Sequence, residues 1–188
     1  LPSPATSDQF QEKLYRALTG AQGVNLTSAA AVQAYIAGLP PEVRTVVGGN
    51  TACVEVDTGD AEIIIDGGSG LRGLGLSLMA REFGRGHGTA HIFLSHAHWD
   101  HLQGLPFFAP AYVPGNRLTF HSPHAHLESA FVGQQNDVYF PVPLSYMRAN
   151  IQFRHIPAEA WSQIGDVRVY PLKLSHPGEC YGYRLEHN

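Results

Sequence analysis

Four potential metal ligands fall within six consecutive residues of this sequence, at His96, His98, Asp100 and His101. Imidazole nitrogens suit zinc, manganese and iron, and a carboxylate adds a harder oxygen ligand. The apolar run 92–94 predicts a strand that ends just before them, and residues two apart in extended backbone, such as His96 and His98, point the same way. Asp100 and His101 follow where a turn can aim them at a neighbouring point. A polar loop that caps a helix is the plainer interpretation, but this density of ligands favours a site for two adjacent metal ions.

Length and composition limit what the chain can hold and bind. Its 188 residues are 44% hydrophobic, which is enough for one sizeable core and too little for two. The formal net charge is −4, and no basic run is present, so charge gives no reason to expect binding to long nucleic acid. A small anionic or ester substrate is compatible with this charge, because a bound metal ion can outweigh it locally. The oligomeric state is not predicted.

The two cysteines, Cys53 and Cys180, lie in patterns that are typical of strands. Two isolated thiols are too few for a disulfide framework, so we expect both to be reduced and buried. No apolar run reaches membrane-spanning length, and the first residues have neither the basic nor the apolar region of a signal peptide. These features predict a cytoplasmic protein that does not associate with membranes.

Residues 1–47 form a predicted N-terminal helical segment. Asp8 and Gln11 have the spacing of a capping box, and helical periodicity follows until Gly20. A second helix is expected to begin at Thr27 or Ser28 and to end near residue 38, before two prolines.

Residues 48–188 are predicted to form an α/β (α+β) domain. Period-two alternation predicts a hairpin over residues 51–65 with a turn at 57–60, followed by a glycine turn at 66–70 and a helical pattern over 71–83. Residues 104–148 are rich in Pro, Gly and aromatic residues, so we expect loops around a cleft, apart from an apolar run at 118–120 and a short helix near 126–132. Further strands are predicted at 151–153, 167–174 and 181–185.

The stretch around His96 resembles the signature of the metallo-β-lactamase superfamily. Its ten residues read Ser-His-Ala-His-Trp-Asp-His-Leu-Gln-Gly over 95–104. The turn Asp66-Gly67-Gly68 resembles that superfamily's first motif, and Ser175-His176-Pro177-Gly178 its third. The resemblance implies an αββα sandwich. Residues 49–51, 103–108 and 114–116 are further similar to a bacterial branch allied to phosphodiesterases and ribonuclease Z.

The resemblance also implies a ligand set and a chemistry. His96, His98 and His176 would hold one metal ion, Asp100 and His101 would belong to a second, and Asp66 would orient the metal-binding loop from behind the ligands. The expected cofactor is one or two zinc ions, with manganese or iron as alternatives. Two cations would lower the pKa of a bridging water and stabilise the developing oxyanion, and Asp100 would act catalytically by orienting that nucleophile.

The sequence departs from the superfamily after its third motif, where the resemblance implies a bridging Asp and a last His. The one candidate after His176 is His187, in a predicted strand. The first four residues look like the remainder of a turn that usually follows an opening strand. We therefore expect a chain cut at both ends, an incomplete sandwich, and a second metal position weaker than the first.

Five further histidines have both plain and functional interpretations. His121, His124 and His126 cluster in a Pro-containing stretch and could bind a metal ion or a phosphate, although a partly exposed loop with chance histidines is the favoured interpretation. His91 and His155 stand at predicted strand ends, where edge residues without ligand partners are expected.

Aromatic residues in and after the metal motif are ambiguous. Trp99 is expected to pack under the metal loop rather than to form the wall of a cleft. Five more could line a substrate pocket or belong to the core, namely Phe107, Phe108, Tyr112, Tyr139 and Phe140. Cys180 is interpreted as a strand residue rather than a thiolate ligand, and Asn116 as a turn residue that tolerates left-handed backbone geometry.

The leading functional prediction is a metal-dependent hydrolase that uses a metal-activated water, acting on a phosphodiester. Hydrolysis of a thioester, lactone or β-lactam is the enzymatic alternative, because the same chemistry attacks acyl carbons. A non-catalytic metal-binding or interaction domain is an alternative of another class.

Overall fold

The structure is a computed structural model that describes residues 6–45, 49–59 and 62–187. The chain divides into two compact units, Leu1–Gly49 and Asn50–Asn188. The predicted turn remnant at residues 1–4, the predicted domain start at Gly48 and one residue of the predicted hairpin turn, Asp60, lie outside the described residues.

The smaller unit consists of helices α1 (Ser7–Gly20), α2 (Ala29–Gly38) and α3 (Pro41–Arg44). A capping box starts α1 as predicted in kind, but Thr6 and Gln9 form it rather than Asp8 and Gln11. Ser28 caps α2 as expected, by accepting a hydrogen bond from the backbone of Ala31. Within residues 6–45, 49–59 and 62–187, none of the helices is both long and apolar enough to span a bilayer.

The larger unit contains two sheets. The first has five strands in spatial order β1 to β5, namely β1 (Val54–Asp57), β2 (Glu62–Ile65), β3 (Thr89–Phe93), β4 (Arg117–Ser122) and β5 (Asn150–His155). The hairpin of β1 and β2 is antiparallel, as predicted, and the pairs from β2 to β5 are parallel. The second sheet is antiparallel and contains β6 (Ser162–Ile164), β7 (Val167–Lys173) and β8 (Tyr181–His187).

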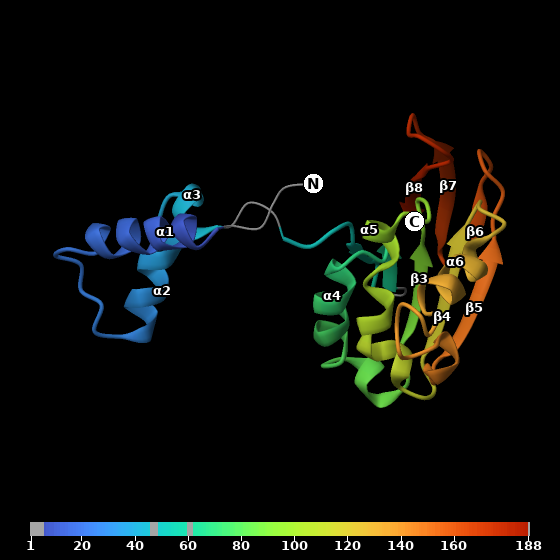
Figure 1. Ribbon diagram of the computed structural model, residues 1–188, viewed down its shortest axis with the longest axis horizontal. Helices are drawn as coiled ribbons and strands as arrows, with labels where there is room; N and C mark the ends of the chain where they lie inside the picture. The colour runs from blue at the N-terminus through green and yellow to red at the C-terminus, as the bar shows by residue number, and fades with distance from the viewer. Residues whose placement is uncertain (1–5, 46–48, 60–61, 188) are drawn as a thin grey trace. The chain divides into compact units, whose positions relative to one another are not determined.

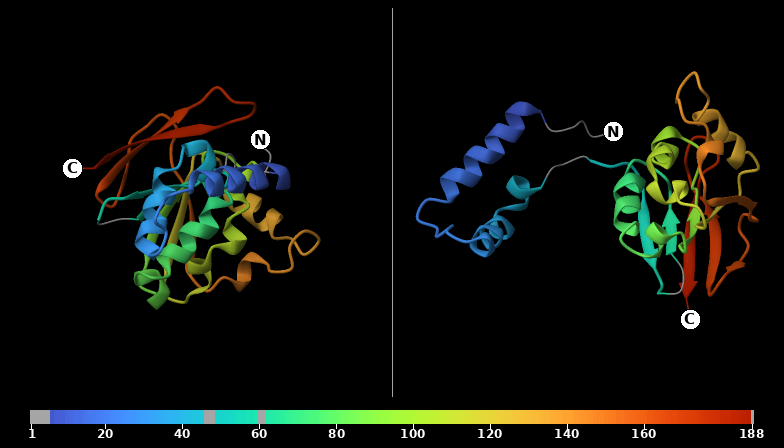
Figure 2. Two further views of the ribbon diagram at one scale, coloured as in Figure 1. Left: turned by 90° about the vertical axis from the view of Figure 1, so that its left-hand side faces the viewer. Right: turned by 90° about the horizontal axis from the view of Figure 1, so that it is seen from below.

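The large sheet has a different partner on each face (Figure 1 and the right-hand view of Figure 2). One face packs under α4 (Gly70–Leu78), α5 (Trp99–Leu102), α6 (Leu127–Gln134) and short 3₁₀-helices at Glu82–Arg85, Leu105–Phe107, Ala109–Tyr112 and Leu144–Tyr146. Two successive residues of β3 point to opposite faces of the sheet. Ile92 enters this core, and Phe93 enters a second core against the small sheet. The predicted mixed α/β class is confirmed.

The stretch 104–148 contains the predicted short helix, which is α6, and its apolar run at 118–120 belongs to β4. This strand lies between β3 and β5 and is longer than the run. Leu118, Phe120 and His121 of β4 are all buried. A parallel strand covered on both faces has no period-two alternation of polar and apolar residues, so its pattern does not reveal its length.

Candidate metal centre

The metal motif begins where β3 ends, at the carboxyl edge of the parallel strands. Ser95 and His96 follow one residue after the strand, and His98 takes the N-cap position of α5. The single helical turn of α5 then carries Asp100 and His101. In α/β sheets this edge is where ligands usually bind.

The glycine turn after β2 fixes α5 from below. Gly67 donates a backbone hydrogen bond to the carbonyl of His101, and Gly104 donates one to the carbonyl of Gly67, both at 2.8 Å. A Cβ on Gly104 would overlap the carbonyl oxygen of Gly68. Glycine is therefore required here because two backbone segments touch, and this close contact sets the position of the metal motif.

His176 reaches the centre from the connection between β7 and β8. The backbone of Tyr181 at the start of β8 donates to the carbonyl of Ser95 at 2.9 Å, and the hydroxyl of Tyr183 donates to the carbonyl of Leu94 at 2.6 Å. These bonds attach β8 to the segment that carries His96. The loop with His176 is thereby held over the end of β3.

Three of the predicted ligands converge. The ring of His96 lies 4.4 Å from that of His98 and 4.6 Å from that of His176, between centroids. Their nitrogens fall within 4.8 Å of one another, and in the described part of the chain no other group of three His, Cys, Asp or Glu side chains does so. His96 is buried, whereas His98 and His176 are exposed. The centre is therefore anchored on one side and open to solvent on the other.

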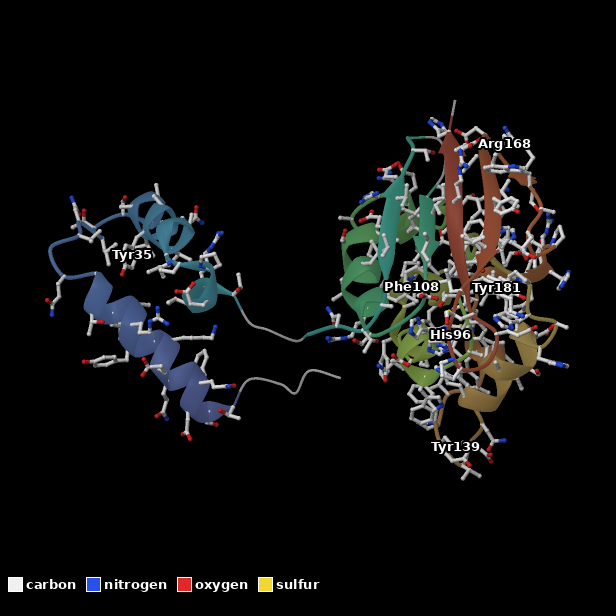
Figure 3. All side chains as sticks on the ribbon, turned by 90° about the horizontal axis from the view of Figure 1, so that it is seen from above. Tyr35, His96, Phe108, Tyr139, Arg168 and Tyr181 are labelled. Atoms are coloured by element: carbon white, nitrogen blue, oxygen red, sulfur yellow. The ribbon has the colours of Figure 1, made fainter. Side chains whose placement is uncertain are left out.

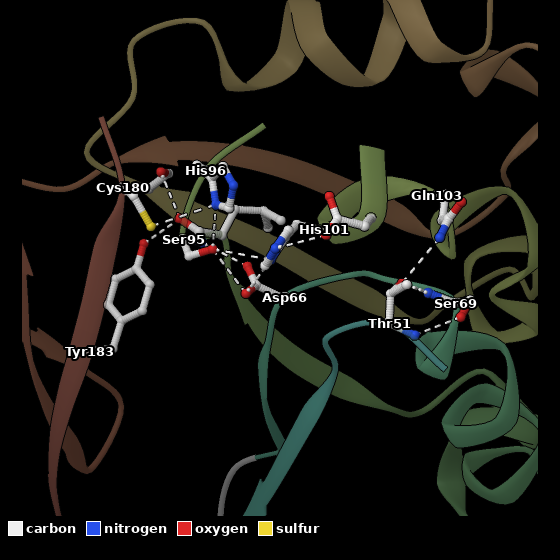
Figure 4. A network of polar contacts seen from close by, with 12 residues as sticks. Thr51, Asp66, Ser69, Ser95, His96, His101, Gln103, Cys180 and Tyr183 are labelled. Atoms are coloured by element: carbon white, nitrogen blue, oxygen red, sulfur yellow. Dashed lines mark hydrogen bonds and ion pairs between the residues drawn. The ribbon is translucent and has the colours of Figure 1, made fainter. Parts of the chain in front are cut away.

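Three histidines have a hydrogen-bond partner at Nδ1, which leaves Nε2 as the nitrogen that can bind a metal ion; Figure 4 shows His96 and His101 of these three. His176 Nδ1 lies 2.8 Å from the carbonyl of Pro177, and His101 Nδ1 lies 2.7 Å from the carboxylate of Asp66. Because both partners only accept, each Nδ1 carries the proton. His96 Nδ1 lies 2.9 Å from Ser95 Oγ, whose own proton can go to Asp66 Oδ2 at 2.9 Å. His96 is then also a donor at Nδ1, and its Nε2 has a free lone pair.

The donor set fits zinc. A metal ion binds neutral imidazole, and a hydrogen bond from the other ring nitrogen is the usual support of a histidine ligand. Burial, together with the nearby rings of His101, His98 and His176, lowers the pKa of His96 to about 4. His96 is therefore neutral at pH 7, in the form that binds metal.

Asp66 lies under the metal motif with 6% of its surface exposed. It accepts from the backbone nitrogen of Ser95 at 2.8 Å, from Ser95 Oγ, and from His101. Its φ of 64° is in the left-handed region that few residues other than glycine adopt. These contacts give Asp66 the surroundings that the sequence predicts for it.

Asp100 and His101 lie beside the three histidines. The ring of His101 is 4.2 Å from that of His96, and its Nε2 is 3.5 Å from Asp100 Oδ2. The structure thus brings all five predicted ligands together. His187 is elsewhere, because it pairs with Val167 at the end of β8 away from Tyr181 and contacts Asp166.

Several expectations for neighbouring residues are wrong. Trp99 does not pack under the loop but has 65% of its surface exposed. Asn116 is not in left-handed backbone geometry. It is fully buried, accepts from the backbone of Gly88 and donates to the carbonyls of Phe83 and Pro110. Hydropathy and residue type predict whether a side chain can be buried, but not which of these loops meet.

The histidines outside the motif also separate. His121 is a buried strand residue, not the partly exposed loop residue that was expected. Its Nε2 lies 3.1 Å from Nδ1 of His91, which stands in the middle of β3 rather than at a strand end. His124 contacts the carbonyl of Ser95 through Nε2 at 3.2 Å. His126 stands at the N-cap of α6, and His155 is exposed.

Cys180 is a residue that sequence reasoning placed only in a strand. It is buried just before β8, and its Sγ lies 3.6 Å from His96 Nδ1. Burial raises the pKa of its thiol. Its four-residue spacing from His176 was the one signal of this proximity, and the structure gives it a contact with the back of a predicted ligand.

Comparison with known proteins identifies the family. The model of the Beta-lactamase superfamily domain matches residues 61–188. The chain belongs to this superfamily. The matched residues include all five predicted metal ligands.

The curated relatives include ribonucleases. Ribonuclease BN of Escherichia coli O1:K1 is 33% identical over 101 residues, and Ribonuclease Z of Ligilactobacillus salivarius is 32% identical over 101 residues. Each match covers 50% of this chain but 30% of the relative, so the chain spans well under half the length of these relatives. Among solved structures, the metallo-beta-lactamase fold protein YhfI from Bacillus subtilis has a TM-score of 0.48 and 20% identity, covering 72% of this chain and 50% of that chain.

Proposed function

We propose that this chain carries the metal centre of a metal-dependent hydrolase that acts on phosphodiesters. The observation that carries the proposal is the convergence of His96, His98 and His176. The likeness to proteins named ribonucleases supports a phosphodiester as the substrate class.

The side chains of the centre would have different roles in binding the metal ions and orienting the water. His96, His98 and His176 would hold a first zinc ion, and Asp100 with His101 would contribute to a second. Bound zinc would lower the pKa of water and stabilise negative charge on the ester. The side chain of Asp100 has 37% of its surface exposed, so its carboxylate would be open to the attacking water and would orient it. His101 stays fixed by Asp66 during this step.

The test is a zinc titration of the metal-free protein, followed by hydrolysis of bis-p-nitrophenyl phosphate. We expect zinc-dependent hydrolysis that inorganic phosphate inhibits competitively. His98→Ala should lower the rate at least roughly tenfold, because even residues that only support a ligand have effects of that size. His155→Ala is the control, since His155 is an exposed histidine at the end of β5.

Three results would contradict the proposal. Hydrolysis that persists in excess chelator would exclude the metal centre as its source. Faster zinc-dependent cleavage of p-nitrophenyl acetate would favour an acyl hydrolase. Stoichiometric zinc binding without cleavage of either ester would favour a non-catalytic metal-binding domain.

A further inference from the structure

An aromatic pocket adjoins the metal centre across one helical turn. Trp99 begins α5 and Gln103 is its C-cap residue, and both line the pocket, while His101 of the same helix lies beside His96. The pocket and the centre therefore share a short segment of the chain, in which Trp99 stands between His98 and Asp100. Figure 3 shows Tyr139, which lines the pocket, at one end of the unit and Arg168 at the other, with His96 between them.

The walls of the pocket are aromatic and uncharged. Its residues include Trp99, Phe107, Tyr139 and Phe140, and none of the described lining residues is Asp, Glu, Lys, Arg or His. Phe107 and Phe140 meet edge to face, with 5.6 Å between ring centroids. Trp99, Phe107 and Tyr139 are more than half exposed, at 65%, 53% and 71%. Such a group of exposed aromatic rings beside a reactive centre is typical of a binding surface.

Two amides give the pocket a polar edge. Gln103 Nε2 donates to Thr51 Oγ1 at 3.1 Å, and Gln134 Nε2 donates to the carbonyl of Leu102 at 3.2 Å. Gln134 Oε1 is shielded from solvent and has no hydrogen-bond partner in the described part of the chain. An unmatched buried acceptor is costly. Because Gln134 lines the pocket, an N–H of a ligand bound there would be a partner for this acceptor.

We infer that this pocket binds the base of a nucleotide-type phosphodiester whose phosphate lies at the histidines. The inference rests on the proposed function and names its substrate class. The cavity of about 210 Å³ is smaller than the roughly 300–1,000 Å³ that encloses a whole small-molecule ligand, so it fits one ring system of a larger substrate. Bases stack on aromatic side chains, and glutamine amides bond to base edges. An apolar acyl group would use the rings but leave the Gln134 acceptor unmatched.

Tryptophan fluorescence tests the inference without relying on activity. The chain has two tryptophans, and Trp161 packs against Arg168 and Tyr170 on the smaller sheet, away from the pocket. Trp161→Phe therefore leaves Trp99 as the reporter.

We expect saturable quenching of this fluorescence by adenosine 5′-monophosphate in the zinc-loaded protein, and none by ribose 5-phosphate at equal concentration. Adding Phe107→Ala should weaken nucleotide binding roughly tenfold, because stacking contributes about 1–3 kcal/mol per base. Tyr146→Ala is the matched control, an exposed aromatic residue outside the pocket.

The outcomes separate this inference from the proposed function. Quenching by the nucleotide without cleavage of phosphodiesters would support the pocket and remove the proposed function. Cleavage without quenching, or equal quenching by ribose 5-phosphate, would overturn the pocket assignment alone. Equal quenching by benzyl alcohol would show that the pocket selects an apolar ring rather than a base, and nucleotide binding unchanged by Phe107→Ala would place the base elsewhere.

Discussion

Two groups of histidines depend on the same parallel strands, and they differ in what each ring nitrogen contacts. At the carboxyl edge, His96, His101 and His176 each have a partner for Nδ1, which leaves Nε2 as the nitrogen that can bind a metal ion. Between the sheets, His91 and His121 contact each other, and His121 Nδ1 is buried with no partner in the described part of the chain. The first arrangement leaves nitrogens that can bind a metal ion, and the second is a polar pair in which His121 is buried and His91 is half-buried.

The difference shows that burial alone does not make a histidine a ligand. His121 is more buried than His96, at 1% against 5% exposure, and burial lowers the pKa of both. The two histidines differ in their surroundings. The carboxylate of Asp66 and the hydroxyl of Ser95 lie behind His96, whereas the ring of Phe93 stacks against His121 with 4.8 Å between centroids. Partners behind the ring and open space in front of it define the metal centre.

Among the substitutions that test this difference, removing the carboxylate of Asp66 should have the largest effect. Asp66→Asn keeps a side chain that tolerates left-handed backbone geometry but removes the charge that orients His101. We expect zinc affinity to fall by roughly ten- to a hundredfold, as for other partners of metal-binding histidines. Chelator competition measures the affinity. Asp57→Asn, which changes an exposed carboxylate in the β1–β2 hairpin, should leave it unchanged. Equal zinc affinity in Asp66→Asn and the parent protein would reduce Asp66 to a turn residue.

The sequence predicts these two groups unequally, for physical reasons. The spacing of the four residues from His96 to His101 places them on one strand end and one turn, which is local geometry. His176 and Asp66 follow from the resemblance of their motifs. The pairing of His91 with His121 depends on the register of two parallel strands, with Phe93 opposite His121, which the local sequence does not specify. The exposure of Trp99 is likewise set by the loops around it, since an apolar side chain has no local signal of a binding role.

Acid should lower the free energy of unfolding through protonation of His121. Burial, and then the charges of His91 and Arg154, lower the pKa of His121 to about 3, from 6.5 for an unperturbed histidine. The folded protein thus binds fewer protons than the unfolded chain between these values. The stabilising contribution of neutral His121 is complete above pH 6.5 and is lost as the pH falls toward 3. The pKa of His91 is also lowered, by burial and by Arg154, and Asp166 opposes this.

His121→Phe should therefore make the protein less sensitive to acid. The free energy of unfolding of the parent should decline by about 1.4 kcal/mol more per pH unit below 6.5 than that of the variant. Urea unfolding from pH 7.5 to 5, with chelator present throughout to remove metal binding, measures the difference. His155→Phe should keep the parental slope, because His155 is exposed. Parallel slopes for His121→Phe and the parent would mean that the pair already shares a proton at neutral pH.

The smallest expected effect on zinc affinity concerns the hydroxyl of Ser95, which connects His96 with Asp66. Ser95 Oγ lies between His96 Nδ1 and Asp66 Oδ2, at 2.9 Å from each, whereas the backbone nitrogen of Ser95 holds Asp66 Oδ1 independently. Ser95→Ala removes the acceptor of His96 but leaves Asp66 and His101 joined, and Cys180 Sγ is the remaining, weaker acceptor near His96. One net hydrogen bond of about 1 kcal/mol corresponds to a loss of zinc affinity of roughly fivefold. Ser69→Ala is the control, since that hydroxyl bonds to Thr51 in the neighbouring turn. An unchanged affinity in Ser95→Ala would show that His96 is oriented without the hydroxyl, and a loss as large as that of Asp66→Asn would make Ser95 the main support of the centre.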